Sequence, residues 1–153
     1  MNSLADIRDF LAQKRIALVG VSRNPRETSH VLFKEFVSRG YDMVAVNPNA
    51  TQINGSSSFA RLEDVTPAPD AALLMTSDAV MEDLLHDWKS GVRRVWIYGT
   101  NGKSKVSPLA LSQLRSIGVI VVDGECPFMF LAKSGGIHTF HGFVRKVLRS
   151  YPA

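Results

Sequence analysis

The stretch from Ile16 to Ser29 combines the residue types that hold an anion at the start of a helix. Ile16 to Val19 is a short apolar run, rich enough in β-branched residues to be a buried strand, and Gly20 ends it. A loop of Ser, Asn, Pro and Arg follows, and then a helix whose apolar side starts at Leu32. The N–H groups at the start of a helix and the helix dipole both favour a phosphate. This pattern is typical of the first unit of a nucleotide-binding α/β protein.

Two arginines of this loop, Arg23 and Arg26, are candidate phosphate ligands, because a guanidinium can donate two hydrogen bonds at once. Thr28 and Ser29 can each cap the helix that follows. Each feature also has a purely structural interpretation. Gly20 can simply permit a tight turn, the capping hydroxyl is needed whether or not phosphate binds, and the arginines can be solvated surface charges.

The loop does not carry the fingerprint of the usual dinucleotide-binding proteins. It has one glycine, Gly20, where that fingerprint needs three. The second strand ends in Asn47-Pro48, whereas an NAD site has an Asp or Glu there for the ribose. The P-loop sequence is absent as well. The pattern therefore predicts a nucleotide ligand, but neither NAD nor ATP bound in the usual manner.

Strands alternate with helices along the chain, which predicts a parallel sheet covered by helices on both faces. The expected strands are Ile16–Val19, Asp42–Val46, Asp70–Met75, Arg94–Tyr98 and Val119–Val122. Helices are expected at the amino terminus around residues 4–11, after Thr28, after Ser77, after Ser107, and over 138–151. Residues 49–58 and 99–105 read as surface loops, and 62–65 as a turn of helix. We expect a Rossmann-like doubly wound α/β fold, with five parallel strands in the order 3-2-1-4-5, as a single domain over residues 1–153.

Ligands of such sheets lie at the carboxyl ends of the strands, at the switch point, which we place between strands one and four. Five segments then surround one crevice: residues 20–29, 47–48, 76–77, 98–101 and 123–127. Tyr98 is accordingly a candidate contact, although with Trp96 it can equally line the core.

The motif Gly20-x-Ser22-x-x-Pro25-Arg26-x-x-Ser29-His30, followed by Gly40-Tyr41 and Val46-Asn47-Pro48, resembles the small stand-alone CoA-binding proteins. These are related to the N-terminal domain of the succinyl-CoA synthetase α subunit. The resemblance extends over nearly the whole chain and implies a Rossmann-like fold that holds CoA along the strand ends. The contacts that it implies are Gly20, Ser22, Pro25, Arg26, Ser29, Asn47, Pro48, Thr76 and Ser77. The ligase's second domain, with its phosphorylated histidine, has no counterpart in so short a chain.

Cys126, His138 and His141 are the residues that could indicate a metal or thiol chemistry. Their spacing matches no common zinc module, and no fourth ligand is evident. A buried, unreactive cysteine is the commoner state, and no pair of carboxylates is placed for acid–base catalysis. We therefore assign no metal ligand and no catalytic residue.

The composition is that of an ordinary globular protein of 153 residues, with 45% apolar and 21% charged residues. The formal net charge of +4 suits an anionic ligand, but no Lys/Arg cluster indicates nucleic acid. One cysteine excludes an internal disulfide and favours a reducing cytoplasm. No apolar stretch is long enough to span a bilayer, and residues 1–15 lack the apolar core of a signal peptide.

Two functions from different classes fit these observations. The first is a binding module for CoA or an acyl-CoA, with no chemistry of its own. The second is a Rossmann-type enzyme that uses NAD(P) or another nucleotide, with its substrate near Tyr98 and Cys126. The acyl group, the pathway, the protein partner and the oligomeric state are not encoded in any motif that we can identify.

Overall fold

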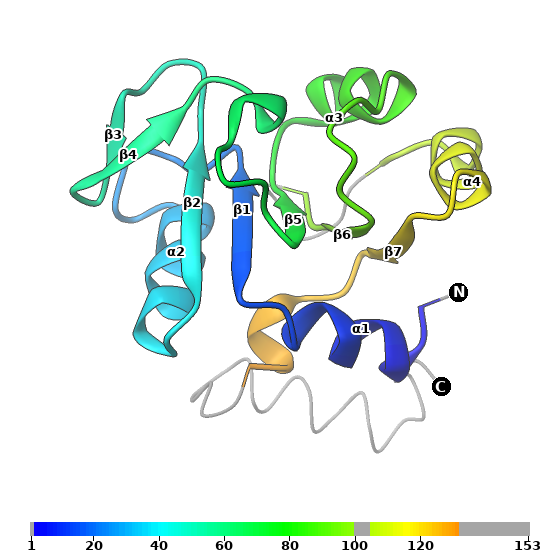
Figure 1. Cartoon of the computed structure of the whole chain (residues 1–153), viewed down its shortest axis with the longest axis horizontal. Helices are drawn as coiled ribbons and strands as arrows, with labels where there is room; N and C mark the ends of the chain where they lie inside the picture. Colours follow the sequence, from blue (N-terminus) through cyan, green and yellow to red (C-terminus); the bar gives the residue numbers. More distant parts are fainter. Residues whose placement is uncertain (1, 100–104, 132–153) are drawn as a thin grey trace.

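The computed structural model of the chain describes residues 2–99 and 105–131, and these residues form a seven-stranded sheet with helices on both faces (Figure 1). In chain order the elements are α1 (Leu4–Leu11), β1 (Arg15–Val19), α2 (Thr28–Ser38), β2 (Asp42–Val46), β3 (Gln52–Ile53), β4 (Ser56–Phe59), the 3₁₀ turn η1 (Leu62–Asp64), β5 (Ala71–Leu74), α3 (Asp78–His86), β6 (Arg94–Ile97), α4 (Pro108–Ser116), β7 (Ile120–Asp123) and the 3₁₀ turn η2 (Pro127–Met129).

The Rossmann-like α/β class is confirmed, and all five predicted strands are present. The predicted N-terminal helix, the turn at 62–65 and the helix after Ser107 are also observed. The helix that we predicted over 138–151 lies outside the described residues, as does most of the 99–105 loop.

The predicted strand number and strand order are wrong. The sheet runs β3-β4-β2-β1-β5-β6-β7, so β5, our third strand, lies beside β1 and not beyond β2. The position beyond β2 is taken by β4, which pairs with it in parallel, and β3 pairs antiparallel with β4. The sequence of residues 49–58 predicts a surface loop, because the Ser-Ser-Ser-Phe of β4 has neither the apolar content nor the β-branched residues of a buried strand.

The switch point therefore lies between β1 and β5, not between β1 and the Arg94–Ile97 strand β6. The connection from β1 to β2 runs through α2 on one face of the sheet, and the connection from β5 to β6 runs through α3 on the other face. The carboxyl ends of β1, β2 and β5 consequently meet at one edge of the sheet.

Each face of the sheet has its own hydrophobic core. Figure 1 shows α3 and α4 on one side of β5–β7, and α1 on the other. The face toward α1 and α2 buries the ring of Trp96, which meets Phe10 of α1 edge-on at 5.2 Å between centroids. The face toward α3 and α4 buries aliphatic side chains, among them Val19, Val46 and Met81. Every residue of β5 is buried, as expected for a central parallel strand covered on both faces.

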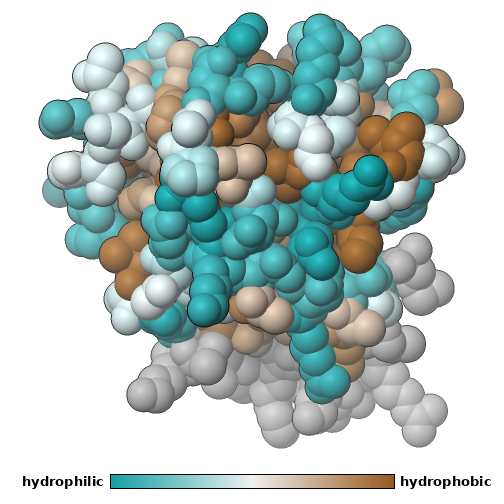
Figure 2. All heavy atoms as spheres, in the orientation of Figure 1, coloured by the Kyte–Doolittle hydropathy of each residue, from teal (hydrophilic) through white to brown (hydrophobic). Residues whose placement is uncertain are grey.

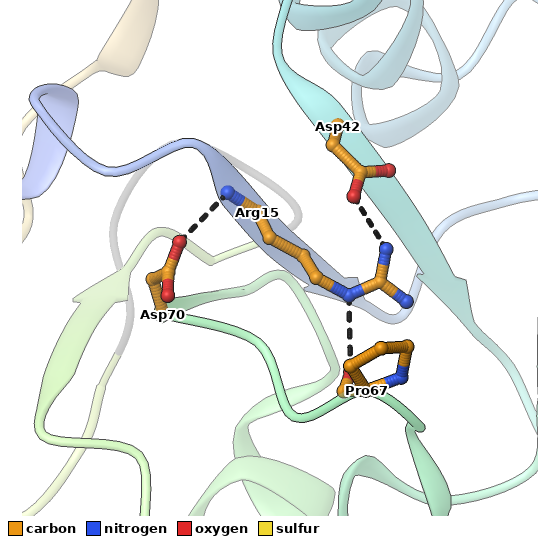
Figure 3. Close-up of polar contacts among 4 residues, drawn as sticks. All are labelled: Arg15, Asp42, Pro67 and Asp70. Atoms are coloured by element: carbon orange, nitrogen blue, oxygen red, sulfur yellow. Dashed lines mark hydrogen bonds and ion pairs between the residues drawn. The ribbon is translucent and has the colours of Figure 1, made fainter.

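At the opposite edge of the sheet, Arg15 joins the amino ends of three strands (Figure 3). Its guanidinium pairs with Asp42 of β2 at 2.5 Å and donates to the Pro67 carbonyl at 3.0 Å. Its backbone N–H donates to the carboxylate of Asp70, next to β5, at 3.0 Å. These contacts hold β1, β2 and the start of β5 together from the end far from the switch point.

Candidate functional site

A cavity of about 660 Å³ opens at the carboxyl ends of β1, β2 and β5, between the η1 segment and α3. Its size lies within the range of about 300–1,000 Å³ that small-molecule sites occupy. The lining residues come from five segments of the chain: Val19, Gly20, Val46, Asn47, Pro48, Asn49, Ala60, Arg61, Leu62, Glu63, Met75, Thr76, Ser77, Val80, Asp83, Leu84, Asp87 and Lys89. This is the place where an open α/β sheet binds its ligand.

The floor of the cavity is apolar and its rim is polar. Val19 and Val46 close it from the sheet, and Val80 and Leu84 close it from α3. The space-filling view shows brown apolar atoms recessed between teal polar side chains near these strand ends (Figure 2). Val80 is 53% exposed, although most valines of this fold are buried. Such an apolar surface can take the flat face of a base or an alkyl chain.

The two helices that flank the switch point, α2 and α3, begin without a side-chain cap. The helices α1 and α4 differ, because Ser3 and Ser107 each accept a hydrogen bond from the first turn that they precede. The start of α3 follows Ser77, which lines the cavity. Donors of the first turn are left for water or an anion when no cap is present.

Our prediction that Thr28 or Ser29 caps α2 is wrong. The cap position is Glu27, and both hydroxyl residues lie inside the helix. Ser29 is buried, and its hydroxyl instead accepts from the Ser22 N–H at 2.9 Å. The Ser22 carbonyl accepts from Nδ1 of the buried His30 at 2.8 Å, which fixes the proton of that ring on Nδ1. The buried residues Ser29 and His30 of α2 therefore fix the backbone of the loop at Ser22, and the Ser22 N–H already donates to the Ser29 hydroxyl.

The tip of the same loop is pre-shaped but exposed. The Ser22 hydroxyl accepts from the Asn24 N–H at 3.0 Å, and the Asn24 side chain accepts from the Arg26 N–H at 3.1 Å. Arg23, Pro25 and Arg26 are all exposed. None of these three residues lines the cavity, and neither do Ser22 and Ser29.

Gly20 is required by the packing of the strands. Its φ is +89°, and a Cβ there would come within 2.5 Å of the Met75 carbonyl oxygen. Its N–H donates to the Val46 carbonyl at 2.9 Å. Gly20 thus lies on the cavity wall where β1 passes closest to the end of β5, and the backbone alone fits there.

Asn47 shapes the cavity from the end of β2. Its side-chain amide donates to the Val21 carbonyl at 2.8 Å, and its side-chain oxygen accepts from the Asn49 N–H at 2.8 Å. The first bond joins the loop after β1 to the end of β2, and the second closes the turn at Pro48. Both polar ends of this side chain are occupied by the protein, so Asn47 positions its neighbours.

The structure thus brings together five of the predicted contacts around the cavity: Gly20, Asn47, Pro48, Thr76 and Ser77. Tyr98 is not among the cavity residues. It belongs to the core on the α1 face of the sheet, whereas the cavity lies on the α3 face. Burial, and next a hydrogen bond to the Cys126 thiol, raise the pKa of the Tyr98 phenol well above its ordinary value.

Sequence reasoning missed the charged residues of the cavity rim. They are Arg61 and Glu63 around η1, and Asp83, Asp87 and Lys89 in and after α3. The signal is weak, because Arg61 and Glu63 follow β4, whose sequence predicts a loop. The others lie on a helix face that looks like ordinary solvated surface.

Within residues 2–99 and 105–131 no group of three or more His, Cys, Asp or Glu residues could hold a metal ion. Cys126 is buried, whereas His138 and His141 lie outside the described residues. The described helices include none that is long and apolar enough to cross a membrane.

The profile of the CoA binding domain family matches residues 14–132. The uncharacterized protein YneT of Bacillus subtilis is 36% identical over 64 residues, which are 41% of this chain and 47% of that protein. The match therefore spans about half the length of that curated relative.

Two of the solved structures with a similar fold illustrate the likeness. Prb, a PH1109 protein redesigned for binding, is 23% identical with a TM-score of 0.74, covering 90% of this chain and 96% of its own. A dinucleotide-forming acetyl-coenzyme A synthetase 1 of Ca. Korarchaeum cryptofilum, solved with phosphate and ADP, is 25% identical with a TM-score of 0.58. That match covers 79% of this chain and 27% of the synthetase. With a family match over most of its length and the fold of those relatives, the chain belongs to the CoA binding domain family.

Proposed function

We propose that the chain binds coenzyme A or an acyl-CoA in the switch-point cavity and acts as a binding module without a reaction of its own. The observation that carries the proposal is the cavity of about 660 Å³ at the carboxyl ends of β1, β2 and β5, in a chain of the CoA binding domain family.

The cavity residues fit the parts of such a ligand. Val46, Pro48 and Val80 offer apolar surface to an adenine ring or to the pantetheine chain. Asn49, Thr76 and Ser77 offer polar groups at the mouth of the cavity. The pyrophosphate would lie toward the uncapped starts of α2 and α3, where helix dipoles favour negative charge. When bound, CoA supplies a thiol that carries an acyl group as a thioester.

The similar structures support this proposal in one further respect. The matched part of the Korarchaeum protein belongs to a synthetase whose name includes coenzyme A, and this chain covers about a quarter of it. We therefore propose that the chain shares a CoA-binding unit with that enzyme and not its synthetase activity. The predicted contacts outside the cavity, from Ser22 to Ser29, would touch only the outer part of the ligand.

The proposal is tested by titrating the purified protein with CoA, acetyl-CoA, NAD and NADP in calorimetry and thermal unfolding. A ligand at 100 times its dissociation constant adds about 2.7 kcal/mol of stability. For a domain of this size that raises the melting temperature by about 5–11 °C. A rise with CoA and none with NAD or NADP is expected. The opposite pattern would refute the proposal in favour of a nicotinamide enzyme.

Val80 offers a sharper test, because it lines the cavity yet is 53% exposed and contributes little to the core. Val80→Glu places bulk and negative charge where the anionic ligand would lie. CoA binding should weaken at least about tenfold, because like charges repel inside an interface. Val37→Glu is the matched control, since Val37 of α2 is 44% exposed and does not line the cavity. Equal affinity of both variants for CoA would place the ligand elsewhere.

A further inference from the structure

We propose that this cavity does not recognise the ribose 3′-phosphate of CoA, so that dephospho-CoA binds at least as tightly as CoA. The inference rests on the proposed function and concerns the chemistry of the rim. Five charged residues line the cavity, and three of them are carboxylates. The pairing of these charges decides what the rim offers to a phosphate.

Both cations of the rim already have carboxylate partners. Nε and an Nη of Arg61 each donate to the Asp64 carboxylate at 3.3 Å, in an ion pair whose side chains are exposed. Nζ of Lys89 lies 2.5 Å from a carboxylate oxygen of Asp87. A phosphate that entered the cavity would have to compete with these partners for each cation.

Two further carboxylates face the cavity from opposite walls. Glu63 lies on η1 and Asp83 on α3, and neither forms an ion pair within the described part of the chain. Both are exposed at the rim. A hydrogen bond to Asp64, followed by the charges of Asp64 and Glu63, raises the pKa of the Arg61 guanidinium, so Arg61 balances part of the Glu63 charge. The three carboxylates of the cavity still outnumber its two cations, one of which is paired with Asp64 outside the cavity. A dianionic phosphate between the two walls is therefore repelled.

The 3′-phosphate belongs to the adenosine half of CoA, and the cavity is where that half fits. The pyrophosphate is drawn to the helix starts beside Gly20 and Ser77, at one end of the cavity. An adenosine attached to it then extends over Pro48 toward η1, between the two carboxylate walls. The exposed arginines Arg23 and Arg26 do not line this space. A neutral ribose hydroxyl fits there better than a phosphate.

The affinities of CoA and dephospho-CoA should be measured by calorimetry for the native protein and for the double variant Glu63→Gln/Asp83→Asn. The native protein should bind dephospho-CoA as tightly as CoA or more tightly. Exposed charge pairs are worth about 0.2–1 kcal/mol each. Removal of both carboxylates should therefore shift the affinity ratio toward CoA by about 2- to 30-fold. The shift should shrink in 0.5 M salt, because exposed charges are screened.

The matched control, Ser112→Lys/Gln113→Lys, changes the net charge by the same amount on exposed positions of α4 outside the cavity. It should leave the ratio unchanged. Native protein that binds CoA tenfold more tightly than dephospho-CoA would overturn the inference and leave the proposed function intact. An equal shift in the control would also overturn it, because the effect would then be one of net charge alone. Binding of neither ligand would refute the proposed function and this inference with it.

Discussion

The role of Gly20 can be measured by comparing it with a second glycine of nearly the same backbone conformation. Gly20 and Gly40 have φ values of +89° and +88°. An added Cβ at Gly40 meets no atom within 4 Å. At Gly20 the same Cβ meets the Met75 carbonyl oxygen at 2.5 Å and a methyl group of Thr76 at 2.9 Å. Alanine at the two positions therefore shares the conformational strain and differs in the steric clash.

The magnitudes follow from these two terms. The left-handed conformation costs an ordinary L-residue about 1–2 kcal/mol, so Gly40→Ala should lower the free energy of unfolding by that amount. The clash at Gly20 involves backbone, which cannot rotate away, and overpacking of this kind costs about 1–3 kcal/mol more. Gly20→Ala should therefore lose about 2–5 kcal/mol in total.

Urea unfolding followed by circular dichroism measures both values, with equal m-values as the check that only stability has changed. The melting temperature should fall further for Gly20→Ala by about 2–12 °C. If the two variants lose the same stability, the strand ends near Met75 are not as close as the structure has them. Because the expected damage is structural, loss of CoA binding in a Gly20 variant would say nothing about contact with the ligand.

Three further predictions concern the charged side chains of Glu82, Arg15 and Arg26. The hydroxyl and the N–H of Ser107 both donate to the Glu82 carboxylate and lower its pKa, so the ionised carboxylate should stabilise the fold at neutral pH and lose this effect as the pH falls through the lowered pKa. The gap in melting temperature between the native protein and Glu82→Gln should therefore close on acidification below about pH 4.5. A gap that stays constant with pH would contradict this prediction. Arg15→Met should lower the free energy of unfolding in urea by about 1–3 kcal/mol, because it breaks the contacts to Asp42 and Pro67. Arg61→Met removes a more exposed ion pair and should lower the free energy of unfolding by less than about 1 kcal/mol. Equal losses in the two variants would refute the role of Arg15. Arg26→Ala should weaken CoA binding in calorimetry only about two- to fivefold, because the side chain is exposed and outside the cavity, and a hundredfold loss would show that the loop closes on the ligand.

The sequence predicts those parts of the fold whose local signals agree with their packing. β2, from Asp42 to Val46, has the bounds that its apolar run indicates, and Ser107-Pro108 starts a helix as its residue types require. α1 is likewise amphipathic, and it buries Ile7 and Phe10. In each case one local pattern specifies both the element and its buried side.

Where the prediction is wrong, tertiary contacts override the local signal. β4 has three serines, and it becomes a strand because β2 supplies backbone partners at Ala45 and Val46. That pairing cannot be read from residues 56–59 alone, and its omission shifted β5 to the wrong side of the sheet. With β4 numbered as the third parallel strand, the parallel strands β4-β2-β1-β5-β6-β7 run 3-2-1-4-5-6, which is the expected order with one strand more.

In the candidate site as well, local sequence predicts some features and tertiary structure decides others. Strand ends are predictable from glycine, proline and polar residues, so Gly20, Asn47 and Thr76 were placed at the crevice. A side chain at a strand end lines the cavity only if it projects from the same face of the sheet as the cavity. Val19, Val46 and Leu74 belong to the α3 face, whereas Tyr98 belongs to the α1 face, although all four lie at or next to carboxyl ends. Nothing in the sequence around Tyr98 indicates that choice.

The missed connection also explains why the cavity exists. In a doubly wound sheet a full helix usually follows each strand and covers its neighbours. After β2 this chain instead forms the short pair β3 and β4, and the return to β5 contains only the three-residue turn η1 as helical structure. Leu62 and Val65 of that return pack on the sheet, but the carboxyl ends of β1 and β2 remain open on the α3 face at Val19 and Val46. The cavity therefore lies where the connection from β2 to β5 leaves the sheet uncovered, and the charged residues Arg61 and Glu63 of that connection form part of its wall.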